Sequence, residues 1–262
     1  MRIATWNVNS IRQRAALVAD WLGRVQPDVL FLQELKCETA AFPAEPFAAL
    51  GYRAEVVGQK AYNGVAVLAR VPFEVTAIAL PGLAPGDAPS GQIEARYIEI
   101  AVKDITLGGL YLPNGNSGGE AGLAYKLHWM DRLALHAAAL LRTGREMALL
   151  GDFNVCPAAL DCAPGALSAG DALLVAPVRA QFRRLLWLGL TDAVRTLYPN
   201  APCYSFWDYQ AGAWPRDRGL RIDHALLSAG LAERLTAALP DRAERDRAQP
   251  SDHVPVVVDL GI

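Results

Sequence analysis

The sequence lacks the features that would direct a protein to a membrane or to an oxidising compartment. It has no apolar run approaching the ~18 residues of a transmembrane helix, and its first residues resemble no secretory signal. The four cysteines have no CxxC or zinc-finger spacing, so we expect reduced thiols at Cys37, Cys156, Cys162 and Cys203. These absences predict a cytoplasmic protein that does not associate with membranes.

A large net charge is also missing. The chain carries a net charge of −2, which argues against binding to nucleic acid through overall positive charge. The charge is unevenly distributed, because residues 179–223 contain seven arginines and four aspartates but no lysine or glutamate. This segment could hold phosphate groups or form an ordinary solvated face, and the sequence leaves both interpretations open.

What the sequence does contain is a series of short apolar strands interrupted by a few helices. We expect helices at 11–22, 122–143 and 178–188, and strands at 2–6, 28–32, 52–57, 64–69, 73–80, 96–102, 105–112, 146–150, 218–227 and 254–260. No linker or change of composition divides the 262 residues, so we expect a single domain over 1–262. This pattern predicts an α/β fold with two packed mixed sheets and helices outside.

Polar side chains follow these strands at the points where the strands end. In Gly-Asp-Phe-Asn (151–154), the spacing of Asp152 and Asn154 puts both side chains on the same side of an extended chain. Asp223 is embedded in an apolar strand, where a carboxylate needs a partner, and His253 is the best candidate. Each residue alone could be a turn, cap or rim residue. Together the strand ends supply Asn7, Glu34, Tyr111, Asp152 with Asn154, and Asp252 with His253.

The chemistry of this set points to a metal-dependent reaction. Most of the groups are hard oxygen ligands, which without cysteine favour Mg²⁺, or alternatively Mn²⁺, over zinc. No Walker phosphate loop is present, and such an oxygen-rich site suits phosphoryl chemistry in which the protein positions groups and neutralises charge. The aromatic segment 204–209 lies near arginines and could stack on a base, fill a sugar-sized void or form a small apolar cluster.

Eight segments of the chain resemble the exonuclease III family of abasic-site endonucleases, and the similarity runs nearly end to end. They are Trp-Asn-Val-Asn-Ser-Ile-Arg (6–12), Leu-Gln-Glu (32–34), Tyr-Asn-Gly-Val-Ala (62–66), Tyr-Leu-Pro-Asn-Gly (111–115), Gly-Asp-Phe-Asn (151–154), Ser-Phe-Trp-Asp-Tyr (205–209), Arg-Gly-Leu-Arg-Ile-Asp-His (218–224) and Pro-Ser-Asp-His-Val-Pro-Val (250–256). Gly-Asp-x-Asn and Ser-Asp-His occur across the wider endonuclease/exonuclease/phosphatase superfamily, whereas the Phe-Trp-Asp-Tyr and Arg-Gly-Leu-Arg-Ile-Asp segments are more specific.

The resemblance implies a DNase-like, four-layered α/β/β/α sandwich and Mg²⁺-dependent cleavage of double-stranded DNA 5′ to an abasic site. It also implies 3′→5′ exonuclease or 3′-phosphatase activity. In this family's pattern Asp152 orients or deprotonates the attacking water, and Asp223 orients His253, which binds the scissile phosphate. Asn154 and Tyr111 lie near the phosphate or leaving oxygen. The implied metal ligands are Glu34, Asn7 and Asp252, and the implied substrate contacts are Arg96, Asn114, Phe206, Leu220 and Ile222.

The chain departs from the family pattern in two places. Ala248-Gln249 stand where the family usually has an acidic and a basic residue, and the 155–177 loop carries few hydrogen-bond donors. Because of both departures, the sequence leaves open how tightly the protein binds the DNA backbone. It also leaves open the balance of endonuclease, exonuclease and 3′-phosphatase activities. A phosphatase acting on a small phosphorylated molecule is the alternative function, and a monomer is the default expectation.

Overall fold

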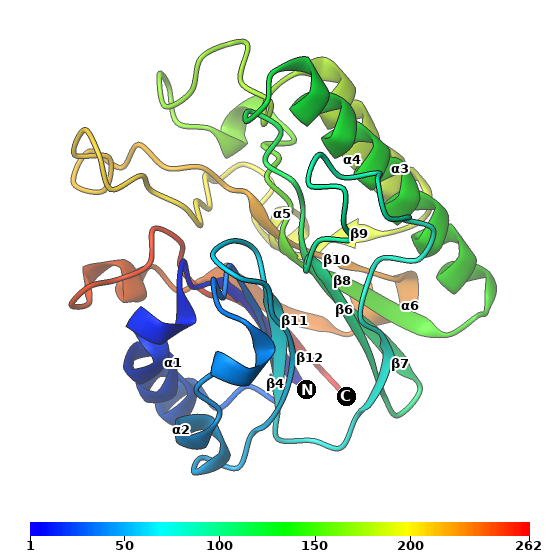
Figure 1. Ribbon diagram of the computed structural model, residues 1–262, viewed down its shortest axis with the longest axis vertical. Coiled ribbons are helices and arrows are strands. Elements are labelled where there is room, and N and C mark those ends of the chain that lie inside the picture. Colours follow the sequence, from blue (N-terminus) through cyan, green and yellow to red (C-terminus); the bar gives the residue numbers. More distant parts are fainter.

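The strands of the computed structural model, which describes residues 1–262, form two six-stranded sheets that pack face to face (Figure 1). In spatial order, the first sheet contains β11 (Leu235–Pro240), β12 (Val256–Leu260), β1 (Arg2–Asn7), β2 (Val29–Gln33), β4 (Val65–Ala69) and β3 (Arg53–Val57). The second contains β5 (Glu74–Ala77), β6 (Tyr97–Val102), β7 (Ile105–Tyr111), β8 (Glu146–Asp152), β10 (Asp223–Leu227) and β9 (Thr191–Asp192). Only β1–β2 and β7–β8 are parallel pairs, so both sheets are mixed.

Helices cover the outer face of each sheet. The first sheet packs against α1 (Ile11–Val25) and α2 (Glu45–Ala48), and the second against α3 (Glu120–Arg142) and α4 (Ala176–Trp187), as Figure 1 shows. The remaining helical turns are short: η1 (Thr39–Ala41), η2 (Ala159–Asp161), α5 (Ala193–Leu197), α6 (Ala229–Ala232) and η3 (Arg242–Asp246). The four-layered α/β/β/α sandwich expected from the sequence is therefore confirmed. None of these helices combines the length and the apolar character needed to cross a bilayer.

The two sheets meet through a continuous apolar layer. Phe31 and Val67 of the first sheet pack in one cluster with Ile98 and Leu150 of the second. Gly109 on β7 allows this close approach, since a Cβ there would lie 2.1 Å from the ring of Phe31. The layer makes the sheets one rigid scaffold on which the strand ends are fixed.

The expected strand at 218–227 is only half correct. Pairing with β8 begins at Asp223, which is therefore the first residue of β10 rather than an embedded one. The preceding segment instead turns toward the loop after β8, where the Arg221 amide donates to the carbonyl of Asp161. The Arg221 guanidinium is 1% exposed and pairs with Asp161 at 2.6 Å and Asp192 at 2.8 Å. This buried ion-pair network holds the segment away from the sheet.

Candidate active site

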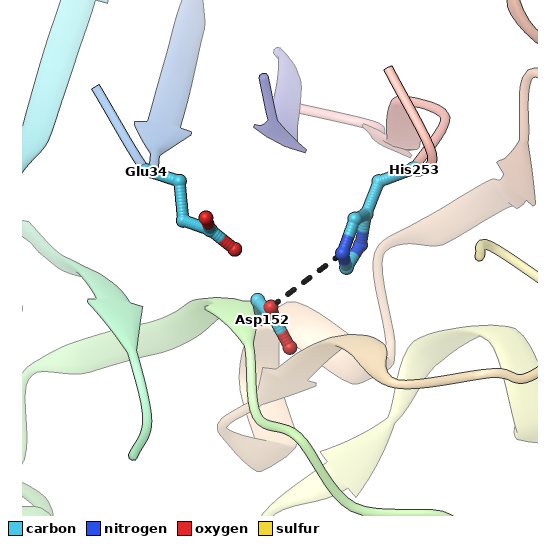
Figure 2. A group of neighbouring side chains, drawn as sticks. All are labelled: Glu34, Asp152 and His253. Atoms are coloured by element: carbon cyan, nitrogen blue, oxygen red, sulfur yellow. Dashed lines mark ion pairs between the residues drawn. The ribbon is translucent and has the colours of Figure 1, made fainter. Parts of the chain in front are cut away.

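The strand ends that carry polar residues meet at one edge of the sandwich. In the parallel pairs, Asn7 lies opposite Gln33 and Tyr111 opposite Asp152, so the carboxyl ends of four strands share that edge. The antiparallel strand β10 brings its amino end there, with Asp223 opposite Asp152. His253 arrives just before β12, which is antiparallel to β1. Figure 2 shows the side chains of Glu34, Asp152 and His253 pointing toward a common space.

A turn after β8 fixes the position of Asp152. At Gly151 a Cβ would lie 1.9 Å from the carbonyl oxygen of Leu110, so only glycine allows the close approach of β8 to β7 there. Asp152 is 1% exposed, and its Oδ1 accepts a hydrogen bond from the amide of Asn154 at 2.9 Å. The Asn154 carboxamide donates to the Leu112 carbonyl and accepts from Asn114. The turn therefore fixes the Asn154 carboxamide, whose second N–H has no partner within the protein, and holds the carboxylate in one orientation.

Asn7 connects the two carboxylates of the site. Its Nδ2 donates to Glu34 Oε1 at 2.8 Å and to Asp152 Oδ2 at 3.0 Å, while its Oδ1 accepts from the amide of Asn9. Lys36 places its ammonium 2.9 Å from Glu34 Oε2. Burial raises the pKa of Glu34, but the Asn7 hydrogen bond and the Lys36 charge outweigh burial and lower it. Glu34 is therefore held as a carboxylate.

Asp223 and His253 form the pair expected from the sequence. Asp223 Oδ2 lies 2.8 Å from His253 Nδ1 and also accepts a hydrogen bond from Ser205 Oγ at 2.6 Å. The opposite ring nitrogen, Nε2, is 3.8 Å from Asp152 Oδ2. Because Asp223 fixes the ring through Nδ1, His253 presents Nε2 to the common space beside Asp152.

The net effect of burial and neighbouring charges is to raise the pKa values of both His253 and Asp152. Burial lowers the pKa of His253, but attraction to Asp223 and Asp152 outweighs burial and raises the pKa to about 10. Burial is the main cause that raises the pKa of Asp152 to about 7, with Asp223 and Glu34 adding repulsion and His253 opposing the rise. At neutral pH the site thus combines an imidazolium with a carboxyl group that readily gains and loses a proton.

The donor set fits a divalent cation held by oxygen ligands. One atom each from Glu34, Asp152 and His253 lies within 4.8 Å of the others, so the three side chains converge on a volume of ionic size. An imidazolium has no free lone pair for a metal, so the two carboxylates are the suitable ligands and His253 is better matched to an anion. Asp252 lies outside this group and accepts a hydrogen bond from Asn9 at 3.1 Å.

A small, partly apolar pocket lies beside Phe206, which separates it from the imidazole of His253. It has a volume of about 220 Å³ and is lined by Phe206 and Leu220 together with the 165–167 turn. The Phe206 ring contacts that of His253 at a centroid distance of 4.9 Å, and Ile222 packs in the same cluster as Leu220. The predicted pocket residues are therefore together, next to the catalytic candidates.

The other predicted residues lie around the rim. Tyr111 is half-buried, and burial followed by the charges of Glu34 and Asp152 raises its pKa well above the usual value. Arg96 stacks on the Tyr111 ring at 4.7 Å, and its Nε pairs with Glu94 at 2.5 Å. Asn114 is exposed. All the site residues expected from the sequence therefore lie at this edge of the sandwich.

Sequence reasoning missed a buried lysine behind the site. Lys126 of α3 is 0% exposed, and its Nζ donates to the carbonyls of Asn114 at 2.8 Å and Asn154 at 2.6 Å. Burial lowers its pKa to about 7, opposed by attraction to Asp152. Its spacing was the signal, because Lys126 precedes the buried Met130 by four residues, one helical turn.

Comparison with known proteins places this geometry in a family. Residues 4–253 match the model of the Endonuclease/Exonuclease/phosphatase family. The chain is 31% identical to exodeoxyribonuclease III of Haemophilus influenzae, over 98% of each chain. The chain belongs to the exonuclease III family of abasic-site endonucleases. It is a nuclease that acts by hydrolysis.

Solved structures of exonuclease III-family proteins superpose on the whole chain. An AP endonuclease from Archaeoglobus fulgidus shares 32% identity with a TM-score of 0.90 and covers 100% of both chains. A 3′ phosphatase from Neisseria, bound to its product DNA hairpin, shares 35% identity with a TM-score of 0.91 over 99% of both chains. Both relatives have the DNase-like fold described above.

Proposed function

We propose that this DNA-repair nuclease uses Mg²⁺ to hydrolyse the phosphodiester bond 5′ to an abasic site, and that it also acts at blocked 3′ ends. The observation that carries this proposal is the meeting of an ionisable carboxyl group, Asp152, with a cationic imidazole, His253, whose ring contacts Phe206 at the edge of a small, partly apolar pocket. The Archaeoglobus relative is an AP endonuclease, and the Neisseria relative is a 3′ phosphatase.

Glu34 would be the main ligand of the cation, and Asp152 the nearest second carboxylate. The amide nitrogen of Asn7, and not its oxygen, faces these two carboxylates, so Asn7 would orient Glu34 and Asp152. If its side-chain amide were rotated by 180°, the oxygen of Asn7 would instead bind the cation. Asp252 lies outside this group and would influence the cation from a greater distance than Glu34 and Asp152. A bound Mg²⁺ would offset the negative charge that develops on the phosphate during in-line attack, and Mn²⁺ could replace it.

Asp152 is the group best placed to accept the proton of the attacking water. Burial raises its pKa above that of an ordinary carboxyl group, which makes it a stronger proton acceptor. His253 donates a hydrogen bond from Nε2 to a phosphate oxygen, while Nδ1 donates to Asp223 Oδ2, which keeps the ring charged and oriented. Tyr111 and Asn154 would donate to the phosphate or the leaving oxygen.

The pocket at Phe206 and Leu220 would receive the baseless sugar. A sugar without a base gives up no base stacking when it turns out of the duplex, so a small pocket selects for it and excludes intact nucleotides. Arg96 and Asn114 would contact the backbone of double-stranded DNA. We further propose that the protein acts as a single-domain monomer without a membrane partner, and its cytoplasmic location remains a prediction.

The test is incision of a duplex oligonucleotide that carries one abasic analogue, in Mg²⁺ and in EDTA. Incision 5′ to the analogue that depends on metal is expected. The alternative, a phosphatase for small molecules, predicts no incision together with phosphate release from p-nitrophenyl phosphate. A duplex with a 3′ phosphate, assayed in parallel, measures the 3′ activity separately from the incision.

A further inference from the structure

Two of the four cysteines pack in the cluster behind Leu220, which lines the pocket. Cys156 is fully buried in a small cluster with Leu220 and Ile222, and Cys162 packs against the same cluster. The turn η2 folds the chain back between the two cysteines, and the Cys162 amide donates to the carbonyl of Ala159. Cys37 and Cys203 belong to two other clusters, so neither is a partner for this pair.

The two thiols differ in environment in a way that suits sequential oxidation. Cys162 is partly exposed whereas Cys156 is fully buried, so an oxidant from solvent reaches Cys162 first. The proximity of the Cys156 thiol also lowers the pKa of Cys162. The same contact, together with burial, raises the pKa of Cys156. An accessible thiolate next to a protonated thiol is the arrangement of an attacking and a resolving cysteine.

We propose that Cys156 and Cys162 form a site of reversible oxidation, at which a peroxide converts the pair to a disulfide and slows turnover. The Cys162 thiolate attacks hydrogen peroxide, forming a sulfenic acid and releasing hydroxide. The Cys156 thiol then attacks the sulfenic sulfur, and the proton of the thiol leaves with the hydroxyl group as water. The two sulfur atoms together lose two electrons, which the peroxide accepts, and a dithiol reductant restores both thiols.

The disulfide would act on the pocket through a short backbone path. Cys162 forms an isolated bridge with Leu220, and the amide of Ala163 donates to the carbonyl of Gly219 at 2.9 Å. Leu220 in turn pairs with Phe206, which contacts His253. A covalent bond that pulls Cys162 toward Cys156 therefore moves the pocket wall that carries Leu220. Because a displacement of ~1 Å can cost up to roughly a hundredfold in rate, we expect a loss of about tenfold.

The test is mass spectrometry combined with turnover after treatment of the full-length protein with hydrogen peroxide. Cleavage after lysine and arginine leaves Cys156 and Cys162 on one peptide, residues 146–179, without the other two cysteines. We expect that peptide to become lighter by two hydrogen atoms, and dithiothreitol to restore both its mass and the activity. The mass readout stays informative even if the protein does not incise abasic DNA, and turnover is measured on both abasic and 3′-phosphorylated duplexes.

Three variants sharpen the result. The double variant Cys37→Ser/Cys203→Ser should keep the full response, whereas Cys162→Ser should keep its activity in peroxide. Cys156→Ser should accumulate a sulfenic acid on Cys162 that dimedone traps. The proposal is overturned if peptide 146–179 keeps its mass while other thiols oxidise, if Cys162 goes directly to sulfinic acid in the wild type, or if the disulfide forms without loss of turnover.

Discussion

Replacing Asp152 by asparagine exchanges one carboxylate oxygen of the site for an amide nitrogen with little change of shape. Asp152 accepts hydrogen bonds from Asn7 through Oδ2 and from the amide of Asn154 through Oδ1. In either orientation the new amide group faces one of these donors with its own N–H. The substitution therefore removes the proton acceptor next to His253 Nε2, takes away one of the two carboxylates that face the cation, and disturbs one hydrogen bond.

The expected loss of rate depends on the role of Asp152 as a proton acceptor, whereas the expected DNA affinity depends on whether His253 keeps its charge. Loss of a general base costs about 10²- to 10⁴-fold in rate. The charge of His253 should survive, because Asp223 lies 2.8 Å from the ring and Asp152 3.8 Å. Coulomb attraction at equal dielectric is then about 1.4-fold stronger from Asp223. We therefore expect kcat to fall about a thousandfold, a rise of roughly 4 kcal/mol in the barrier, with little change in DNA affinity.

Single-turnover incision of the abasic duplex measures the rate, and fluorescence anisotropy in EDTA measures the Kd for the same DNA. Asp104→Asn is a matched control, since Asp104 is exposed in the turn between β6 and β7, at the end of β7 opposite to Tyr111. The control should keep its rate within about twofold, as is usual for surface substitutions. Retained turnover in Asp152→Asn would refute the assignment of Asp152 as the proton acceptor.

Two further substitutions test the buried charges. The folded-state pKa of His253, about 10, lies above its ordinary value of 6.5, so its stabilising effect is complete below pH 6.5 and lost as the pH rises through 10. In EDTA, the wild-type free energy of unfolding should fall by about 2–4 kcal/mol more than that of His253→Gln between pH 7 and 10, as urea denaturation measures. Lys126→Met leaves the buried carbonyl of Asn154 and the partly buried carbonyl of Asn114 without this donor. We expect it to lower the free energy of unfolding by about 1–3 kcal/mol and to lower kcat about tenfold with less change in KM. Lys103→Met, at an exposed lysine, should change neither stability nor kcat.

The position of the active site could be predicted from the sequence because strand ends can be recognised locally. Apolar runs followed by Glu34 or by Asp152 and Asn154 identify a strand and its last residue without any knowledge of its partner. The partner of Asp223 could be proposed because few groups in the chain can neutralise a buried carboxylate. What joins these ends is the parallel pairing of β1 with β2 and β7 with β8, and sequence periodicity does not encode strand pairing.

The interactions missed by the sequence analysis depend on contacts that no sequence motif or periodicity signals. Lys126 is buried because two turns from other elements offer it carbonyl oxygens, and nothing within its helix signals those acceptors. Cys156 and Cys162 have no recognisable motif spacing, and only the fold of the intervening turn brings them into one cluster. Arg221 leaves the expected strand because Asp161 and Asp192 lie within reach of its guanidinium.

The most direct measurement of the central claim is the binding of Mn²⁺ to the DNA-free protein, followed by electron paramagnetic resonance. Glu34 and Asp152 together should hold the ion, so Glu34→Gln should weaken binding by about tenfold or more, in the range seen when support for a metal site is lost. Glu38→Gln, at an exposed glutamate four residues along the chain, should bind as the wild type does. Equal Mn²⁺ affinity in wild type and Glu34→Gln would contradict a metal-dependent site at this edge of the sandwich.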